Sequence, residues 1–175
     1  MRLLAAIVCV VVLSGVARAA DPITIPFKVI EDGFKKAECT NDDLKDEERT
    51  EVEDLGGGLR LVEIYCWRAA YQSGSIFFVV DPKAPEKARL VRFNVWSTKA
   101  KKLTPAYSLS NPGYNAETKV LGMAHKGRGV GDCGEIGQWK WNGTDFVLTG
   151  YWDKPNCDGK EFDEGRRWQV YPPRR

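Results

Sequence analysis

The amino-acid sequence predicts an all-β protein, mainly antiparallel, that folds as a sandwich or small barrel held by two disulfides. Short runs of β-branched and aromatic residues recur after residue 58, and clusters of Gly, Pro and Asn separate them. Helical periodicity is scarce over the same region. Short strands joined by tight turns are typical of antiparallel architectures, and an even set of cysteines is typical of small exported domains.

Residues 1–19 have the features of a secretory signal peptide. Arg2 supplies a positive start, residues 3–13 form an apolar run, and Ala17-Arg18-Ala19 has the A-x-A form that signal peptidase accepts. The run is too short to cross a bilayer of about 30 Å as a helix, and no later segment is apolar enough to span one. We therefore expect cleavage after Ala19, a single mature β-domain over residues 20–175, and a periplasmic or secreted location.

The charge balance argues against partners that require a strongly charged surface. The whole chain has 26 Lys and Arg against 24 Asp and Glu, and loss of Arg2 and Arg18 with the signal peptide would make the two counts equal. A neutral protein has no electrostatic attraction to nucleic acid or to an anionic membrane. Neither is expected as a partner.

The cysteines that remain after the expected cleavage are Cys39, Cys66, Cys133 and Cys157. An even number in an oxidising compartment predicts disulfides. Of the three possible pairings we favour Cys39–Cys66 and Cys133–Cys157, because each closes a loop of about 25 residues and would stabilise the fold by roughly 3 kcal/mol. No metal site is expected, because the chain has no C-x-x-C and its only histidine is His125. No cofactor is expected either.

The N-terminal part of the mature chain looks the least like strands. Pro22 and Pro26 predict that residues 23–30 are an extended edge or entry segment. A stretch rich in acidic residues follows, and a short helix near residues 41–50 is expected within it, since acidic side chains stabilise the first turn of a helix. Residues 56–58, Gly-Gly-Gly, then break the chain sharply.

The strands expected after these glycines begin with residues 59–67, 75–80 and 90–97. Two hairpins follow. One spans residues 114–124, with its turn at residues 115–119, and the other joins residues 138–141 to 145–151 through Asn142-Gly143. Asn-Gly is the strongest short-range hairpin signal, because both central residues of a type I′ turn need φ > 0.

The least ordinary stretch is residues 125–134, which contain four glycines. It matches G-x-G-x-x-G formally, but a hairpin follows in place of the helix that a dinucleotide site requires. Two interpretations remain. The stretch is either a tight connection tied down by Cys133, with Arg128 paired to Asp132, or a binding loop that presents Lys126 and Arg128 to an anionic or carboxylate group. In either case at least one of its glycines should have φ > 0; the candidates are Gly127, Gly129 and Gly131.

The string Lys-Gly-Arg-Gly-Val-Gly-Asp-Cys-Gly at residues 126–134 resembles the signature of a family of exported bacterial proteins of unknown function. Residues 114–119, 139–148 and 155–157 support the resemblance, which covers residues 60–160 and corresponds to the C-terminal part of longer members. The resemblance implies an extracytoplasmic β-domain with paired cysteines and brings no activity. In size, disulfides and β-architecture the chain is also similar to small periplasmic inhibitors of lysozyme.

Trp139 and Trp141 are two residues apart, so on a strand both rings point to one face. They either pack in the core or form an exposed stacking platform for a sugar ring or for an aromatic patch of a partner.

The sequence favours a binding protein over an enzyme. It has no G-x-S-x-G motif for a serine hydrolase, and nothing in the spacing of its acids selects a catalytic pair. We therefore predict a periplasmic, non-enzymatic binding or inhibitory module of the cell envelope, whose partner is an envelope protein or a glycan. The alternative is an envelope glycan hydrolase with an unrecognised carboxylate pair. The candidate binding residues are Lys126, Arg128, Asp132, Trp139 and Trp141, and no residue is assigned a catalytic role.

Overall fold

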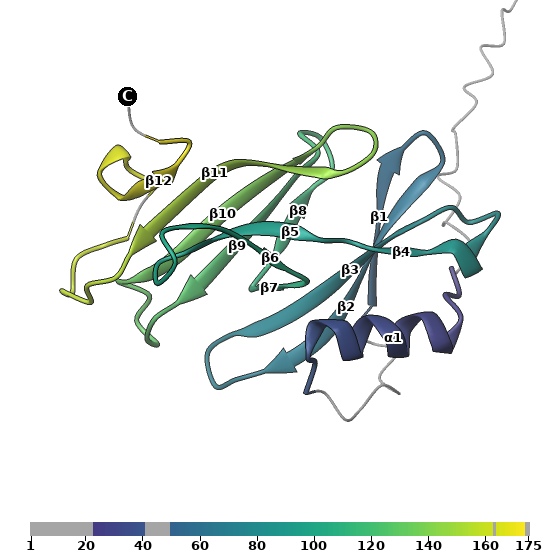
Figure 1. The fold of residues 1–175 in the computed structure, drawn as a ribbon, viewed down its shortest axis with the longest axis horizontal. Helices are drawn as coiled ribbons and strands as arrows, with labels where there is room; N and C mark the ends of the chain where they lie inside the picture. The colour runs from purple at the N-terminus through teal and green to yellow at the C-terminus, as the bar shows by residue number, and fades with distance from the viewer. Residues whose placement is uncertain (1–22, 41–49, 163, 174–175) are drawn as a thin grey trace, which may run out of the picture.

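The computed structural model describes residues 23–40, 50–162 and 164–173. Its strands pair in antiparallel fashion and form two five-stranded sheets and a two-stranded ribbon (Figure 1). The predicted mainly antiparallel β-fold is confirmed, with sheets that are open. The expected signal peptide over residues 1–19, and residues 41–49 of the expected short helix, lie outside the described residues. Within the described ranges no helix is long and apolar enough to cross a membrane.

The first sheet is built around a central hairpin. Its strands, in spatial order, are β1 (Thr50–Gly56), β2 (Leu59–Arg68), β3 (Ser73–Val80) and β4 (Arg89–Leu90), and β7 (Ser108–Ser110) also pairs with β3. The turn between β1 and β2 contains Gly57 and Gly58, whose φ angles of +64° and +83° lie in the left-handed region that glycine enters without strain.

The second sheet contains β12, β11, β10, β9 and β8 in that order. Their bounds are β8 (Gly113–Asn115), β9 (Val120–Lys126), β10 (Gly134–Trp141), β11 (Phe146–Lys154) and β12 (Gln169–Tyr171). The ribbon pairs β5 (Phe93–Ser97) with β6 (Lys102–Ala106). Two short 3₁₀ helices complete the described elements, η2 (Pro85–Lys87) and η3 (Arg166–Trp168). The single strand expected at residues 90–97 is therefore divided between β4 of the first sheet and β5 of the ribbon.

The extended segment predicted for residues 23–30 is wrong from residue 27 onward, because the helix α1 (Phe27–Ala37) begins there. Pro26 stands directly before the first helical residue, where its missing N–H leaves no helical hydrogen bond unmade. Val29, Ile30 and Phe34 recur at helical spacing and pack against the first sheet. The burial of this apolar stripe outweighs the strand-edge tendency of the two prolines.

Charged side chains on the opposite face of α1 support the same helix. Lys28 pairs with Asp32 at 2.7 Å and Lys35 pairs with Glu31 at 2.8 Å, each across one helical turn. Pairs at this spacing stabilise an exposed helix by about 0.2–0.5 kcal/mol each.

Both predicted hairpins are present, but the turn between β10 and β11 is not the expected two-residue turn. Trp141 pairs with Phe146, so the residues between them form a longer connection. Gly143 has φ +100°, whereas Asn142 is not in the positive-φ region. The side-chain oxygen of Asn142 instead accepts a hydrogen bond of 2.8 Å from the backbone N–H of Asp145. Asn therefore closes this turn through its side chain.

Both faces of the first sheet are covered, and two apolar clusters result. Between the first sheet and the second lie Leu61, Phe77, Val79, Val91, Phe93, Leu109, Leu121, Met123, Trp139, Trp141, Phe146, Leu148 and Tyr151, among others. Between the first sheet and α1 lie Ile25, Phe34, Val62, Cys66, Ile76, Phe78 and Val80. Figure 1 shows α1 lying against β2 and β3, away from β9, β10 and β11. The complete burial of β3 after its first residue follows from this arrangement.

Three tryptophan rings lie directly over glycines. An added Cβ at Gly137 would come within 2.3 Å of the ring of Trp139, and one at Gly74 would come within 2.1 Å of the ring of Trp67. Gly150 and Trp152 repeat the arrangement at 2.3 Å. These strand glycines are therefore required by close packing and not by an unusual φ angle.

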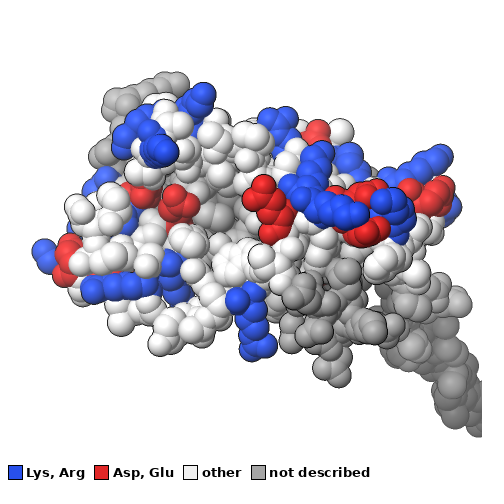
Figure 2. All heavy atoms as spheres, turned by 60° about the horizontal axis from the view of Figure 1, so that its bottom comes forward, with Lys and Arg blue, Asp and Glu red and all other residues white. Residues whose placement is uncertain are grey.

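The charged side chains on the face shown in Figure 2 are of both signs and lie interspersed. This face has no large region of one charge among the residues described. The distribution agrees with the near balance of basic and acidic residues in the whole chain.

Candidate functional site

The glycine-rich loop between β9 and β10 is closed at its base. The backbone N–H of Gly127 donates to the carbonyl of Cys133 at 2.9 Å, and the N–H of Gly131 donates to the carbonyl of Arg128 at 2.9 Å. Gly131 has φ +72°, which confirms the expectation of at least one glycine with φ > 0. At Gly134, φ is +134° and an added Cβ would lie 1.9 Å from the carbonyl oxygen of His125. Only glycine fits at that position.

The two disulfides have the predicted pairing. Cys39 is bonded to Cys66, and Cys133 is bonded to Cys157. The second disulfide ties the glycine-rich loop to the segment that follows β11. That segment is also held by the fully buried Lys154, whose ammonium donates to Asp158 at 2.7 Å and to the carbonyl of Lys160 at 2.7 Å.

Arg128 and Asp132 pair across the loop. Nε of Arg128 donates to Oδ1 of Asp132 at 2.7 Å, and Nη2 donates to Oδ2 at 2.5 Å, a bidentate arrangement. The N–H of Gly159 donates to Oδ2 as well, at 2.5 Å. These hydrogen bonds, that of Arg128 first, hold the pKa of the Asp132 carboxyl far below its usual range. The first interpretation of the loop, a tight connection fixed by this pair, is therefore present in the structure.

The guanidinium of Arg128 remains accessible to solvent although it pairs with Asp132. The side chain of Asp132 is 6% exposed, whereas that of Arg128 is 49% exposed. Nη1 of Arg128 takes no part in the two hydrogen bonds to Asp132. Asp132 therefore positions a guanidinium that keeps donors on its outer side.

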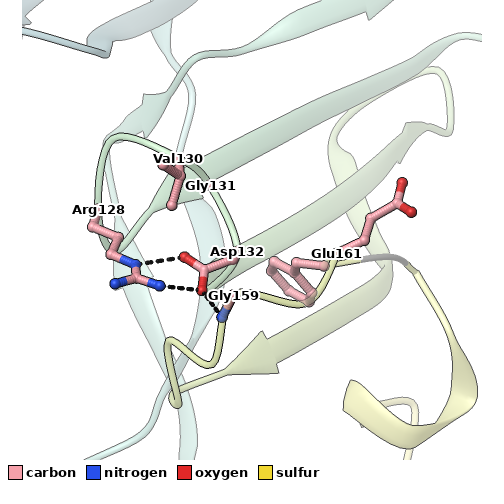
Figure 3. Close-up of a pocket in the computed structure, with 7 residues that line it drawn as sticks. Arg128, Val130, Gly131, Asp132, Gly159 and Glu161 are labelled. Carbon is pink, nitrogen blue, oxygen red and sulfur yellow. Dashed lines mark hydrogen bonds and ion pairs between the residues drawn. The ribbon is translucent and has the colours of Figure 1, made fainter.

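A pocket of about 450 Å³ lies beside this pair (Figure 3). The glycine-rich loop and the segment after β11 form its two walls, with Val130 on one and Phe162 on the other. Figure 3 shows Glu161 on the far side of the pocket from Arg128. The complete lining is Arg128, Val130, Gly131, Asp132, Gly159, Glu161 and Phe162. The Cys133–Cys157 disulfide joins the two walls at their base.

The turn between β2 and β3 rests on the same loop. Gln72 accepts a hydrogen bond of 3.0 Å from the backbone N–H of Lys126. The ring of Tyr71 lies over Gly129, where an added Cβ would come within 3.2 Å of it. Tyr71 is 72% exposed and Val130 is 78% exposed. We call Tyr71, Arg128 and Val130 the loop surface.

The sequence-predicted residues fall into two groups. Lys126, Arg128 and Asp132 come together at the loop, and the aliphatic stem of Lys126 lies along Gly131. Trp139 and Trp141 are buried in the core between the sheets. Of the two alternatives for these tryptophans, the structure agrees with core packing, because their face of β10 is the one that the first sheet covers.

Sequence reasoning missed the contributions of Tyr71, Gln72 and Phe162. Gln72 and Lys126 are 54 residues apart in the chain, and only the packing of two hairpins brings them together. The one available signal was Gln-Ser-Gly after Tyr71, which marks a turn with an exposed aromatic residue beside it.

The loop also brings together Asp132, Cys133 and Cys157, whose potential ligand atoms lie within 4.8 Å of one another. Both sulfur atoms are consumed by the disulfide, so they are not available as thiolate ligands. The role of Asp132, Cys133 and Cys157 is therefore to stabilise the loop.

The fold and the site together define a disulfide-bonded antiparallel β-protein, whose glycine-rich loop is held by a disulfide and by an Arg–Asp pair. The chain belongs to the family described as Protein of unknown function (DUF1176), whose profile matches residues 25–173. The resemblance predicted from residues 60–160 is confirmed, and the match extends beyond them on both sides. The chain is also 30% identical over 120 residues to Uncharacterized protein YpfG of Escherichia coli (strain K12).

That alignment covers 69% of this chain and 34% of the relative, so the chain spans about a third of the relative's length. No solved structure matches the chain.

Proposed function

We propose that this protein is an extracytoplasmic binding or inhibitory module of the cell envelope, and that it contacts an envelope protein through the loop surface. The observation that carries the proposal is that Tyr71 and Val130 are exposed at the loop that presents the guanidinium of Arg128, which Asp132 holds in place. The two disulfides support the compartment, because such bonds persist in oxidising environments.

The residue types of the loop surface are those of a protein-binding hot spot. Tyr and Arg are enriched among residues that contribute most to binding, and they work best when an apolar side chain beside them excludes water. Here the loop is fixed before any partner arrives, by a disulfide, by the Arg128–Asp132 pair and by Gln72. Binding would therefore cost little loss of loop freedom, which favours affinity.

The chemistry of the surface indicates what a partner would present. The outer donors of Arg128 suit a carboxylate, and the neighbouring ammonium of Lys126 adds attraction for a negative charge. Val130 and Tyr71 suit an apolar side chain next to that carboxylate. A protein surface supplies this combination more readily than a neutral glycan does.

Three probes test the proposal on the mature protein: an extract of envelope proteins freed of peptidoglycan, purified protein-free peptidoglycan, and lysozyme. We expect saturable binding from the protein extract and no sedimentation with peptidoglycan. Loss of lysozyme activity in the presence of the protein would identify inhibition as the mode of action. Sedimentation with peptidoglycan without binding from the extract would contradict the proposal, and release of soluble glycan fragments would establish the hydrolase alternative.

A further inference from the structure

A row of polar side chains crosses the second sheet next to the core residues Met123 and Tyr151. His125 on β9 stands directly opposite Glu135 on β10, and Glu135 stands directly opposite Asp153 on β11. Residues directly opposite in an antiparallel pair point to the same face, with Cβ atoms about 4.5–5.5 Å apart. All three side chains are partly buried.

His125 is in contact with a hydroxyl group at one end of this row. Oγ of Ser110, at the end of β7, lies 3.1 Å from Nδ1 of His125. With the ring neutral and its proton on Nε2, Nδ1 is an acceptor and the hydroxyl donates to it. This is the distance at which an imidazole can take the proton from a serine.

A hydrogen bond from a buried tyrosine fixes the side chain of Glu135. The hydroxyl of Tyr151, which is fully buried, donates to Oε2 of Glu135 at 2.8 Å. Burial raises the pKa of Glu135, this hydrogen bond opposes the rise, the repulsion of Asp153 adds to it, and the attraction of His125 opposes it. The Tyr151 hydroxyl thus fixes the carboxyl of Glu135 at the strand position opposite His125. Asp153 is held in turn by Thr98, whose hydroxyl donates to it at 2.7 Å.

We propose that Ser110 and His125 are the nucleophile and the general base of an ester-cleaving site, with Glu135 as a positioning residue that orients the imidazole. The hydroxyl, the base and the acid come from β7, β9 and β10. The hydroxyl lies within hydrogen-bond distance of the base, and the acid stands opposite the base in the strand register. None of these three residues belongs to the loop surface, and the proposal does not rest on the proposed function.

The reaction divides into two balanced steps. Oγ of Ser110 attacks the carbonyl carbon of the ester while Nδ1 of His125 takes the hydroxyl proton, and that proton passes to the leaving alkoxide as the C–O bond breaks. Water then attacks the carbonyl carbon of the acyl-serine while Nδ1 of His125 takes one of its protons, and His125 passes that proton to Oγ of Ser110 as the acyl–oxygen bond breaks and the carboxylic acid leaves. An ester is the expected class, because an alkoxide leaves with less help from an acid than an amide nitrogen does.

A fluorophosphonate probe tests the serine directly, because an activated Oγ forms a P–O bond to the probe and releases fluoride. We expect one adduct, mapped to Ser110 by mass spectrometry, and none in Ser110→Ala. His125→Gln should slow labelling by at least about 100-fold, in line with the usual contribution of a general base. Ser108→Ala removes a hydroxyl from the same strand and is the matched control, which should label at the native rate.

The variant Glu135→Gln tests whether Glu135 orients His125 or only stabilises the fold. Because burial raises the pKa of Glu135, the ionised carboxylate disfavours folding above that pKa, and the neutral amide should melt no lower than the native protein at pH 8. Its labelling should nevertheless fall by about tenfold, with the pH profile of the labelling rate shifted. Absence of any adduct on the native protein, or an adduct that forms equally well in a folded His125→Gln, would overturn the proposal.

Discussion

Gly137→Ala should lower the free energy of unfolding by about 3 kcal/mol, the upper part of the range for overpacking a core. The added Cβ would lie 2.3 Å from the ring of Trp139, and that ring has no solvent-exposed side toward which it can move. The ring is also fixed by the hydrogen bond from its Nε1 to the carbonyl of Asn94 at 3.1 Å. A thermal melt should show a fall of about 10 °C, from the usual relation between free energy and melting temperature for a domain of this size.

Gly113→Ala is the matched control for this substitution. Gly113 is also a strand glycine, its φ is not positive, and an added Cβ there meets nothing within 4 Å. Its melting temperature should therefore stay close to the native value, with a change in stability within about 0.5 kcal/mol. If the two variants melt alike, Gly137 is not required by the packing of Trp139.

Removal of either disulfide should cost about 3 kcal/mol, because the two close loops of similar length. The sequence separations are 27 for Cys39–Cys66 and 24 for Cys133–Cys157. Denaturant unfolding of the double variants C39A/C66A and C133A/C157A should therefore give similar losses of stability.

Binding should distinguish the two variants. Only Cys133–Cys157 joins the loop to the segment that carries Gly159 and Phe162, so only its removal should weaken binding at the loop surface. The variant C39A/C66A lacks the other disulfide and is the control for lowered stability. Equal loss of binding in both variants, measured where both remain folded, would show that the loop disulfide has no special part in binding.

Much of the fold could be predicted because its signals are local. Val91 and Phe93 are two residues apart, a spacing that places both side chains on one face of an extended chain, and both enter the core. The disulfide pairing followed from the preference for two loops of about 25 residues each. The helix α1 was missed because Pro26 was taken as a strand-edge signal, although Val29, Ile30 and Phe34 already showed a helical period.

The candidate site could be predicted only where it is local. Arg128 and Asp132 are four residues apart in one loop, and their pairing was one of the two interpretations of that loop. Gln72 and Tyr71 reach the loop from another hairpin, and the opposition of His125 and Glu135 depends on strand register. Neither relation leaves a pattern in a single sequence, because both depend on how the sheets pair and pack.

The most direct test of the central claim, that the loop surface contacts an envelope protein, compares Val130→Asp with Val147→Asp. Val130 is 78% exposed in the loop and Val147 is 47% exposed on β11, so both variants should melt close to the native protein. The amount bound from the peptidoglycan-free envelope extract, at one fixed concentration, should fall by at least about tenfold for Val130→Asp and stay unchanged for Val147→Asp. Native binding by Val130→Asp, or equal loss in both variants, would contradict the account.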